Sequence, residues 1–252
     1  MTKSLYFTAL AASILVLAPI GSTFAQERPF EIEFELGSAW QARNDVQIPS
    51  DTGTRFALDD VTGSGPWVTG RVNFNWNVKG QNELRLVLAP LGYDETGFLP
   101  QPVEFAGQSF TDGQPVEARY RFNSWRATYR YRFDRPSGWQ FWAGVTAKVR
   151  DAEIRLIQGE TVGLDDDTGL VPLLHLAARY RINDRWSFDG DLDGLAGGPG
   201  RAFDLSLRFN YQLDERWSLG LGYRGLEGGV DNDEVYNFAW FNSVVANLRL
   251  TL

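Results

Sequence analysis

Apolar and polar residues alternate one by one over long stretches of this 252-residue chain. From Phe203 to Leu213 every second residue is apolar, and each residue between them is polar or charged. Side chains of a β-strand point alternately to opposite faces, so a period of two predicts strands with one apolar and one polar face. Ten strands are expected, at about 30–43, 67–78, 83–93, 118–133, 139–150, 170–182, 185–195, 202–213, 216–224 and 240–252. Eight and twelve strands stay open as alternatives, because the strand edges in 101–122 and 151–170 are blurred.

Large aromatic residues gather beside four short polar turns. The turns join paired strands at 79–82, 134–138, 183–185 and 214–216. The aromatic residues around them are Trp76, Tyr131, Phe133, Trp139, Phe141, Trp186, Phe188, Tyr211 and Trp217. Amphipathic rings favour the membrane–water interface and form girdles around barrels that cross membranes. The sequence therefore predicts an all-β fold, a transmembrane antiparallel up-and-down β-barrel with its apolar faces toward lipid.

The competing architecture is a secreted, soluble β-sandwich or lipocalin-like barrel, in which the apolar faces would point inward. Two features favour the membrane barrel. The expected strands have about 9–13 residues, which matches the roughly 9–11 that a membrane-spanning strand needs. The aromatic clusters also lie at one end of every hairpin, which an interior packing role would not require.

Short and long connections alternate along the chain. The long ones cover about 44–66, 94–117, 151–169, 194–201 and 225–239. Barrels of the outer membrane have short periplasmic turns, longer external loops and an even number of strands. This pattern predicts that the long connections face outward. In one strand the alternation slips, since Tyr120 and Phe122 are out of phase with Trp125, which predicts either a bulge or a strand that continues above the membrane.

The first 25 residues have the features of a secretory signal peptide. Lys3 supplies a positive start, residues 10–20 are apolar, and Thr23-Phe24-Ala25 is a small-x-small cleavage site. We therefore expect a barrel domain at 26–252. No other segment approaches the ~20 apolar residues of a spanning helix. The chain has no cysteine for a disulfide, and its net charge of −8 disfavours nucleic-acid binding.

The whole expected barrel domain resembles Gram-negative outer-membrane β-barrel proteins. The resemblance rests on the signal segment, the alternation and the final strand 244–252, Val-Val-Ala-Asn-Leu-Arg-Leu-Thr-Leu. The class commonly ends in Phe or Trp, whereas Leu252 stands here. Segments 122–131, 193–202 and 222–229 are similar to proteobacterial members of the class that carry no assigned chemistry. The resemblance implies location in the outer membrane, contact with its lipids including lipopolysaccharide, and insertion by the outer-membrane assembly machinery.

The polar faces of the expected strands carry many charges, which the barrel would enclose. Positive and negative residues are sorted by strand, so either a transverse field across a narrow pore or a packed network of ion pairs is expected. Ten strands lie near the size at which side chains fill the lumen, which favours the packed interior. The expected lumen charge network comprises Glu31, Glu33, Glu35, Arg126, Arg130, Arg132, Lys148, Arg150, His175, Arg179, Arg181, Asp189, Asp191, Asp193, Asp204 and Arg208.

His175 is the only histidine and the only candidate general base of that type. Small membrane barrels that act on lipids pair such a base with a nucleophilic serine. No serine or threonine flanks His175, and Ser206 is the nearest hydroxyl expected on the same side. Omptin-like proteases instead need an Asp–His pair and an Asp pair above the membrane. We therefore expect no enzymatic activity and a hydrogen-bonded interior histidine, with a lipid-acting enzyme as the weaker alternative.

Two acidic segments could hold a divalent cation in the external loops, namely 165–167 and 231–234. Their carboxylates are the hard oxygen ligands that Ca²⁺ and Mg²⁺ prefer, but the spacing of neither is that of an EF-hand loop. The glycine-rich segment 194–200 lacks the strand-to-helix context of a phosphate-binding loop, so a tight external turn is expected. No cofactor is predicted. The function expected is that of a structural or interaction barrel, with a narrow pore for small charged solutes as the alternative.

Overall fold

The computed structural model describes residues 29–135, 137–198 and 200–252. The predicted signal peptide lies outside these residues. The elements are β1 (Phe30–Gln47), β2 (Phe56–Ala57), α1 (Leu58–Thr62), β3 (Trp67–Lys79), β4 (Asn82–Ala89), β5 (Gly92–Phe98), β6 (Val103–Phe105), β7 (Gln108–Phe110), β8 (Pro115–Asp134), β9 (Trp139–Gln158), β10 (Thr161–Arg181), β11 (Trp186–Gly197), β12 (Gly200–Gln212), β13 (Trp217–Asp231) and β14 (Tyr236–Thr251). Within this part of the chain, no helix is long and apolar enough to cross a membrane.

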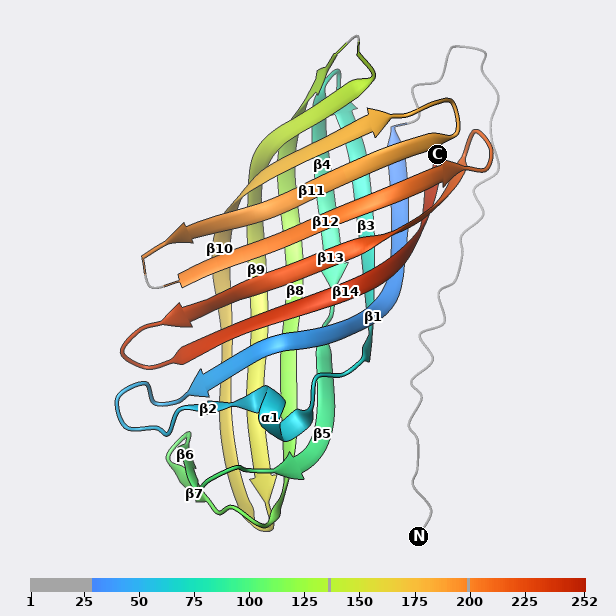
Figure 1. Ribbon diagram of the computed structural model, residues 1–252. Helices are drawn as coiled ribbons and strands as arrows, with labels where there is room; N and C mark the ends of the chain where they lie inside the picture. The colour runs from blue at the N-terminus through green and yellow to red at the C-terminus, as the bar shows by residue number, and fades with distance from the viewer. Residues whose placement is uncertain (1–28, 136, 199) are drawn as a thin grey trace.

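Ten long strands form a closed antiparallel barrel, as the alternation predicted. They are β1, β3, β4 and β8 to β14, each paired with its neighbours along the chain, and β14 pairs with β1 to close the ring (Figure 1). The closing pair runs in register from Glu31 opposite Thr251 to Gln41 opposite Phe241, with one shift between Gln41 and Arg43. Closure leaves the ladder without a free edge strand around most of the barrel.

The outward faces are apolar, as a membrane barrel requires. Leu36, Val68 and Leu221 are 63%, 77% and 62% exposed. Aromatic rings contact one another near the short turns, for example Trp139 and Tyr180 with centroids 4.8 Å apart. The charged faces point inward. This polarity is the reverse of that of a soluble β-sandwich, so the competing architecture is excluded.

Several of the expected external loops are in fact strands. The prediction of a loop at 151–169 is wrong. Strand β9 continues to Gln158, β10 begins at Thr161, and the two strands meet in a tight turn. The segments 194–201 and 225–239 likewise shorten to turns between strands. The expected strand at 83–93 also extends further outward. Its two parts, β4 before Pro90 and β5 after Leu91, both pair with β8.

Strand β8 explains why the alternation slips near Trp125. The strand runs unbroken from Pro115 to Asp134, and its pairing with β9 shows no register shift, so a bulge is excluded. Alternate side chains are buried from Val116 to Tyr120 and again from Ser124 to Arg130, and Phe122 between them is half-buried in the same phase. Toward the short turns the buried positions are polar, such as Arg126, whereas in the outer half they are apolar, such as Tyr120. The strand keeps its geometry, and only the interior changes from polar to apolar.

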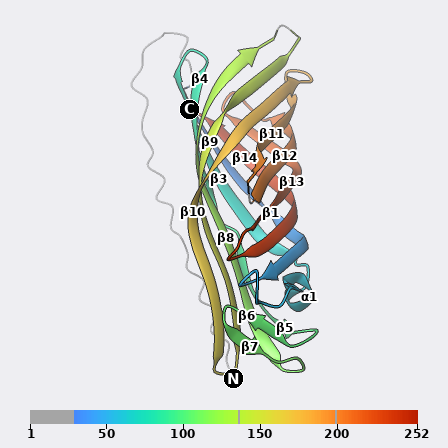
Figure 2. The same cartoon turned by 90° about the vertical axis from the view of Figure 1, so that its left-hand side faces the viewer.

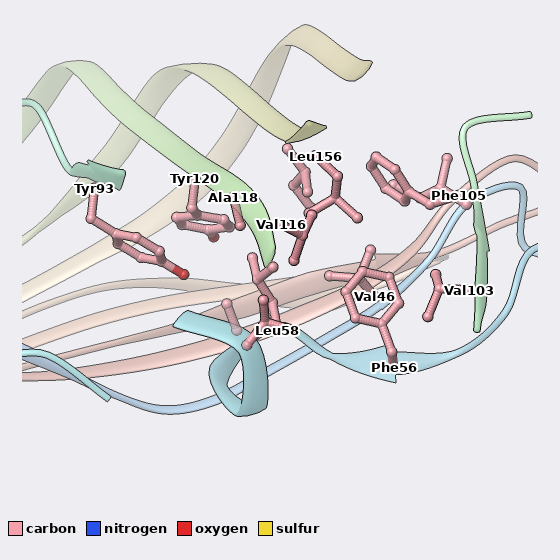
Figure 3. Packing of buried hydrophobic residues seen from close by; sticks show 14 of the residues in the cluster. Val46, Phe56, Leu58, Tyr93, Val103, Phe105, Val116, Ala118, Tyr120 and Leu156 are labelled. Carbon is pink, nitrogen blue, oxygen red and sulfur yellow. The ribbon is translucent and has the colours of Figure 1, made fainter. Parts of the chain in front are cut away.

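The outer half of the barrel therefore contains an apolar core. Phe105, Phe110 and Leu156 are fully or almost fully buried there, and Figure 3 shows Val46 and Phe56 packed beside Val103 and Phe105, with Leu58 on α1 next to them. The residues come from β1, β2, α1, β5, the β6–β7 hairpin, β8, β9 and β14, and from the loops beside them. This core fixes the segment between β1 and β3 against the outer end of the barrel.

Candidate functional site

A network of ion pairs fills the lumen at the level of the apolar outer surface. Its centre is Asp204 on β12, which is 3% exposed. One carboxylate oxygen accepts hydrogen bonds from Arg71 at 2.7 Å and Arg126 at 2.6 Å, and the other accepts one from Arg224 at 2.5 Å. Arg224 also binds both carboxylate oxygens of Glu35 at 2.8 Å. These contacts join β1, β3, β8, β12 and β13 across the interior.

Toward the short turns, Arg249 on β14 bridges two acids. It donates to Glu33 at 2.8 Å and to Asp189 at 2.9 Å. Asp189 is also held by Arg179 through two hydrogen bonds, at 3.0 and 2.8 Å, and Arg208 pairs with Glu33. Charge-assisted and bidentate contacts of this kind are the stronger class of hydrogen bond, and they lock the side chains in one geometry.

His175 lies in the same network and is completely buried. Its Nδ1 is 2.8 Å from a carboxylate oxygen of Asp193, and its Nε2 is 3.5 Å from Nη1 of Arg130. A guanidinium can only donate and a carboxylate can only accept, so the ring lies between a donor and an acceptor. Asp193 also accepts from Arg126 at 2.7 Å and from Thr146 at 2.9 Å. Both ring nitrogens are therefore engaged.

The hydroxyl of Ser206, the nearest nucleophile expected, does not bond to His175. Ser206 is fully buried, and its Oγ has no hydrogen-bond partner among the described residues. A base and nucleophile normally lie within about 2.6–3.2 Å of each other. The interior thus contains a histidine and a serine without the geometry of nucleophilic catalysis.

The ligand atoms of His175, Asp191 and Asp193 lie within 4.8 Å of one another, which is close enough to hold a metal ion. The carboxylates already have cationic partners, since Arg85 donates to Asp191 at 2.6 Å and Arg126 binds Asp193. A metal ion would have to displace these guanidinium groups. The donor set is thus satisfied by ion pairs, and it gives no indication of a metal.

The structure brings together most of the residues expected in the lumen network, but not all. Arg130 pairs with Glu83 at 2.9 Å, and Arg132 contacts Glu83 at the end near the short turns. Arg150 instead pairs with Asp167 in the outer part of β10, and Arg181 is exposed. Lys148 is buried beside the network. The other expected members, which lie within the network, are Glu31, Glu33, Glu35, Arg126, His175, Arg179, Asp189, Asp191, Asp193, Asp204 and Arg208.

Five charged residues of the network were missed in the sequence. They occupy the same inward phase as the residues that were named, so the alternation contained the signal. Glu83 and Arg85 lie two residues apart on β4, whereas Arg71, Arg224 and Arg249 belong to strands with few charges, so only the pairing across the lumen reveals their role. The missed residues are Arg71, Glu83, Arg85, Arg224 and Arg249.

A cavity of about 420 Å³ lies outward of the network. Its walls are mainly apolar and include Phe122, Leu170, Leu195 and Phe241. Lys148 from β9 also lines it. A second, more polar hollow of about 820 Å³ lies at the end near the short turns. The ion-pair network lies between the two, and a smaller hollow of about 200 Å³ lies among its own residues, including Glu33, Arg85 and Asp191.

No protein-family model and no curated protein sequence matches this chain. Among solved structures, the outer-membrane protease OmpT from Escherichia coli aligns with a TM-score of 0.52 and 10% identity, over 89% of this chain and 97% of that one. Neisserial surface protein A aligns at 0.36 and 12%, over 88% and 97%, and Ail of Yersinia pestis at 0.38 and 9%, over 88% and 99%. The fold is thus that of Gram-negative outer-membrane β-barrels, as the sequence resemblance predicted.

Proposed function

We propose that this chain is an integral outer-membrane β-barrel that neither conducts solutes nor catalyses a reaction, and that acts through its fold and its outer surface. The observation that carries the proposal is the ion-pair network at the membrane level. Arg126 reaches from β8 to acids on both β11 and β12, and its side chain is 1% exposed. A barrel of ten strands is close to the size that side chains fill, so such a network leaves no continuous aqueous path.

The network also has an energetic reason to stay closed. Removing one partner of a buried ion pair leaves an uncompensated charge, which is strongly destabilising. Opening a pore through the network would separate several such pairs at once. We therefore expect the lumen to stay closed under ordinary conditions.

A narrow pore for small charged solutes is the second candidate, and the hollow near the short turns favours it. That hollow is lined by Arg179, Arg181 and Arg249, which would favour anions. It would need a path past the network to conduct. A lipid-acting enzyme is a weaker alternative, since His175 and Ser206 lack the geometry of a catalytic pair.

The proposed location implies the partners of the chain. The apolar outer surface would contact outer-membrane lipids, with lipopolysaccharide around the external rim, and the assembly machinery of that membrane would insert the barrel. The acidic external segments would bind divalent cations weakly.

Single-channel recording of the refolded protein in planar bilayers tests the proposal. We expect negligible current for the natural chain and for Arg201→Gln, which removes an external ion pair with Glu227 and a contact with the Phe238 ring but leaves the lumen network intact. Replacing Arg126 by Ala should introduce leak events if the network closes the lumen. A steady, ion-selective conductance of the natural chain that changes with Arg179→Glu would overturn the closed barrel and support the pore.

A further inference from the structure

Strands β10 and β11 separate in the outer part of the barrel. β10 pairs with β9 from Thr161 to Tyr180, but with β11 only from Leu174 to Arg181. Across the described residues, 161–173 consequently have no strand partner on the β11 side. Figure 2 shows β10 running away from β11 and β12 along this stretch. We call this opening the β10–β11 seam.

The sequence of the seam suits an unpaired strand edge. Pro172 lies on it, and proline has no backbone N–H to leave without a partner. On the other side, a Cβ atom added to Gly197 would meet no atom within 4 Å, so the space beside β11 is open. Where such a gap reaches lipid, it is tolerated only if it opens into protein or a cavity.

The apolar cavity of about 420 Å³ lies directly behind the seam, because both strands contribute to its walls. Its lining residues include Leu170 and Pro172 on β10, Leu195 and Gly197 on β11, and Phe122 and Phe241 on the far side. Small-molecule sites typically enclose about 300–1,000 Å³ and are mostly apolar with a few placed polar groups. The cavity has the size and the walls of a site for a hydrocarbon chain.

Lys148 is the buried cation of the cavity, whereas Arg150 in the same lining is paired with Asp167, and Arg201 is paired with Glu227. Lys148 is 2% exposed, and its Nζ lies 4.5 Å from the ring centroid of Phe122. No carboxylate in the described part of the chain forms an ion pair with it. Of the charged groups around it, Asp204 is already bound by three arginines, and Arg71, Arg126 and Arg150 share its positive sign. Buried charges are normally paired, so a carboxylate bound in the cavity would compensate the ammonium charge of Lys148.

The lumen network does not need the charge of Lys148. The network contains equal numbers of acids and arginines. Arg132 does not change this balance, because it pairs with Asp134 at the end near the short turns. The acids are Glu31, Glu33, Glu35, Glu83, Asp189, Asp191, Asp193 and Asp204, and the arginines are Arg71, Arg85, Arg126, Arg130, Arg179, Arg208, Arg224 and Arg249. Among the described interior residues, Lys148 is the cation in excess.

We propose that the cavity binds a single-chain anionic amphiphile of the fatty-acid class. The carboxylate pairs with Nζ of Lys148, and the hydrocarbon chain lies against the apolar walls and passes through the β10–β11 seam toward the outer leaflet. Each of the three observations assigns one part of the ligand. The unpaired cation sets the charge of the head, the cavity sets the chemistry of the chain, and the seam sets its route.

Photo-crosslinking of the whole protein in phosphatidylcholine nanodiscs tests the site directly. The probe is dodecanoate with a diazirine at the end of its chain, and the labelled residues are mapped by mass spectrometry. We expect labelling concentrated at 170–172 and 195–197, and competition by dodecanoate but not by the uncharged dodecanol. Labelling spread over lipid-facing positions such as Leu207 would overturn the proposal, as would competition only by an anionic phospholipid.

Two variants separate the head-group contact from the route. Lys148→Met keeps the length and apolar stem of the side chain, and it should weaken probe retention by about tenfold or more, as expected for a hydrogen bond to a charged group. Lys79→Met, in an exposed turn, is the matched control and should change nothing. Gly197→Trp fills the seam and should abolish labelling, whereas Leu207→Trp adds the same bulk on the outer surface and should not.

The variants remain decisive if one fails to assemble. Gly197→Trp leaves every ion pair in place, so it tests the route even if Lys148→Met misfolds. Unchanged labelling in a folded Gly197→Trp variant would overturn the proposal. A closed lumen and this site are separate claims, because conductance tests the ion-pair network and crosslinking tests the cavity.

Discussion

Arg126 on β8 and Asp204 on β12 meet across the barrel interior with 2.6 Å between donor and acceptor, although they lie far apart in the sequence. Asp204 accepts from two further arginines, and Arg126 also binds Asp193. The two residues thus connect both halves of the charged interior. The stability of the barrel should be most sensitive at this contact.

The first prediction follows from the three arginines around Asp204. Asp204→Asn removes the shared negative charge and leaves three buried cations with less compensation, so unfolding should become easier by about 3–5 kcal/mol. Glu227→Gln is the control, because its pair with Arg201 is partly exposed and should be worth at most about 1 kcal/mol. Equilibrium unfolding in detergent micelles measures both. Equal losses in the two variants would contradict the central role of Asp204.

The sequence predicted the number of barrel strands and the inward phase of the charges, because both depend only on local alternation. It did not predict which charges meet. Arg71 and Arg224 lie on strands with few other charges, and their partners are set by the curvature of the barrel. Alternation reports which face a side chain occupies, whereas the partner across a lumen depends on strand tilt and stagger.

The outer strand extensions were missed for a different reason. We expected charged side chains inside the barrel and apolar side chains outside it. Between Pro115 and Ser124, the buried side chains of β8 are instead apolar. A strand whose buried residues turn apolar looks like a break in the pattern. The β10–β11 seam left no comparable signal, since only Pro172 marks it in the sequence.

The second prediction concerns orientation. The short turns should face the periplasm and the extended strand ends should face outward. The chain has no natural cysteine, so single cysteines can be introduced at Ser137 and at Asp166, which are both exposed. A membrane-impermeant maleimide applied to intact cells should label Asp166→Cys, and should label Ser137→Cys only after the outer membrane is permeabilised. The opposite labelling pattern would mean that the barrel has the reverse orientation in the membrane.

The third prediction is that His175 has no catalytic role. Both ring nitrogens are engaged and the ring is fully buried, so His175→Asn should leave any lipid-hydrolysing activity of the purified protein unchanged. Release of fatty acid from phospholipid and lipopolysaccharide measures this. The Ser206→Ala protein serves as the matched control for the expected nucleophile. Hydrolysis that disappears in both variants would establish a catalytic pair.

The fourth prediction concerns pH and Asp165 in the outer part of β10. Partial burial, followed by the negative charge of Asp166, raises the pKa of Asp165 above its ordinary value. A carboxyl whose folded-state pKa is raised stabilises the fold when protonated, and this contribution is lost as the pH rises through that pKa. Asp165→Asn should therefore raise the thermal midpoint at neutral pH, and the gain should disappear in acid below about pH 4. Asp184→Asn, in an exposed turn near the opposite end, should show no such pH-dependent gain.

The external rim carries an excess of acids. By the expected topology they are Asp45, Asp51, Asp59, Asp60, Asp94, Glu95, Glu104, Asp112, Asp165, Asp166, Asp167, Glu227, Asp231, Asp233 and Glu234. Some are neutralised within the chain, as Asp94 is by Arg119 at 2.5 Å. Others, such as Asp166 and Asp233, are exposed. Lipopolysaccharide, the lipid that we propose to surround the rim, is also anionic, and two such surfaces repel within a Debye length of about 8–10 Å.

The fifth prediction is that divalent cations relieve this repulsion by bridging rim carboxylates and lipid phosphates, through the oxygen ligation that Ca²⁺ prefers. Of the described residues, the three-donor cluster with metal-binding spacing lies in the interior at His175, so the rim should bind Ca²⁺ weakly. Millimolar Ca²⁺ should raise the thermal midpoint in lipopolysaccharide-containing membranes, and a chelator should reverse the effect. The double variant Asp166→Asn, Asp233→Asn should reduce the gain, while phosphatidylcholine membranes should show none. Identical midpoints with Ca²⁺ and with chelator would mean that the rim acids are simply hydrated.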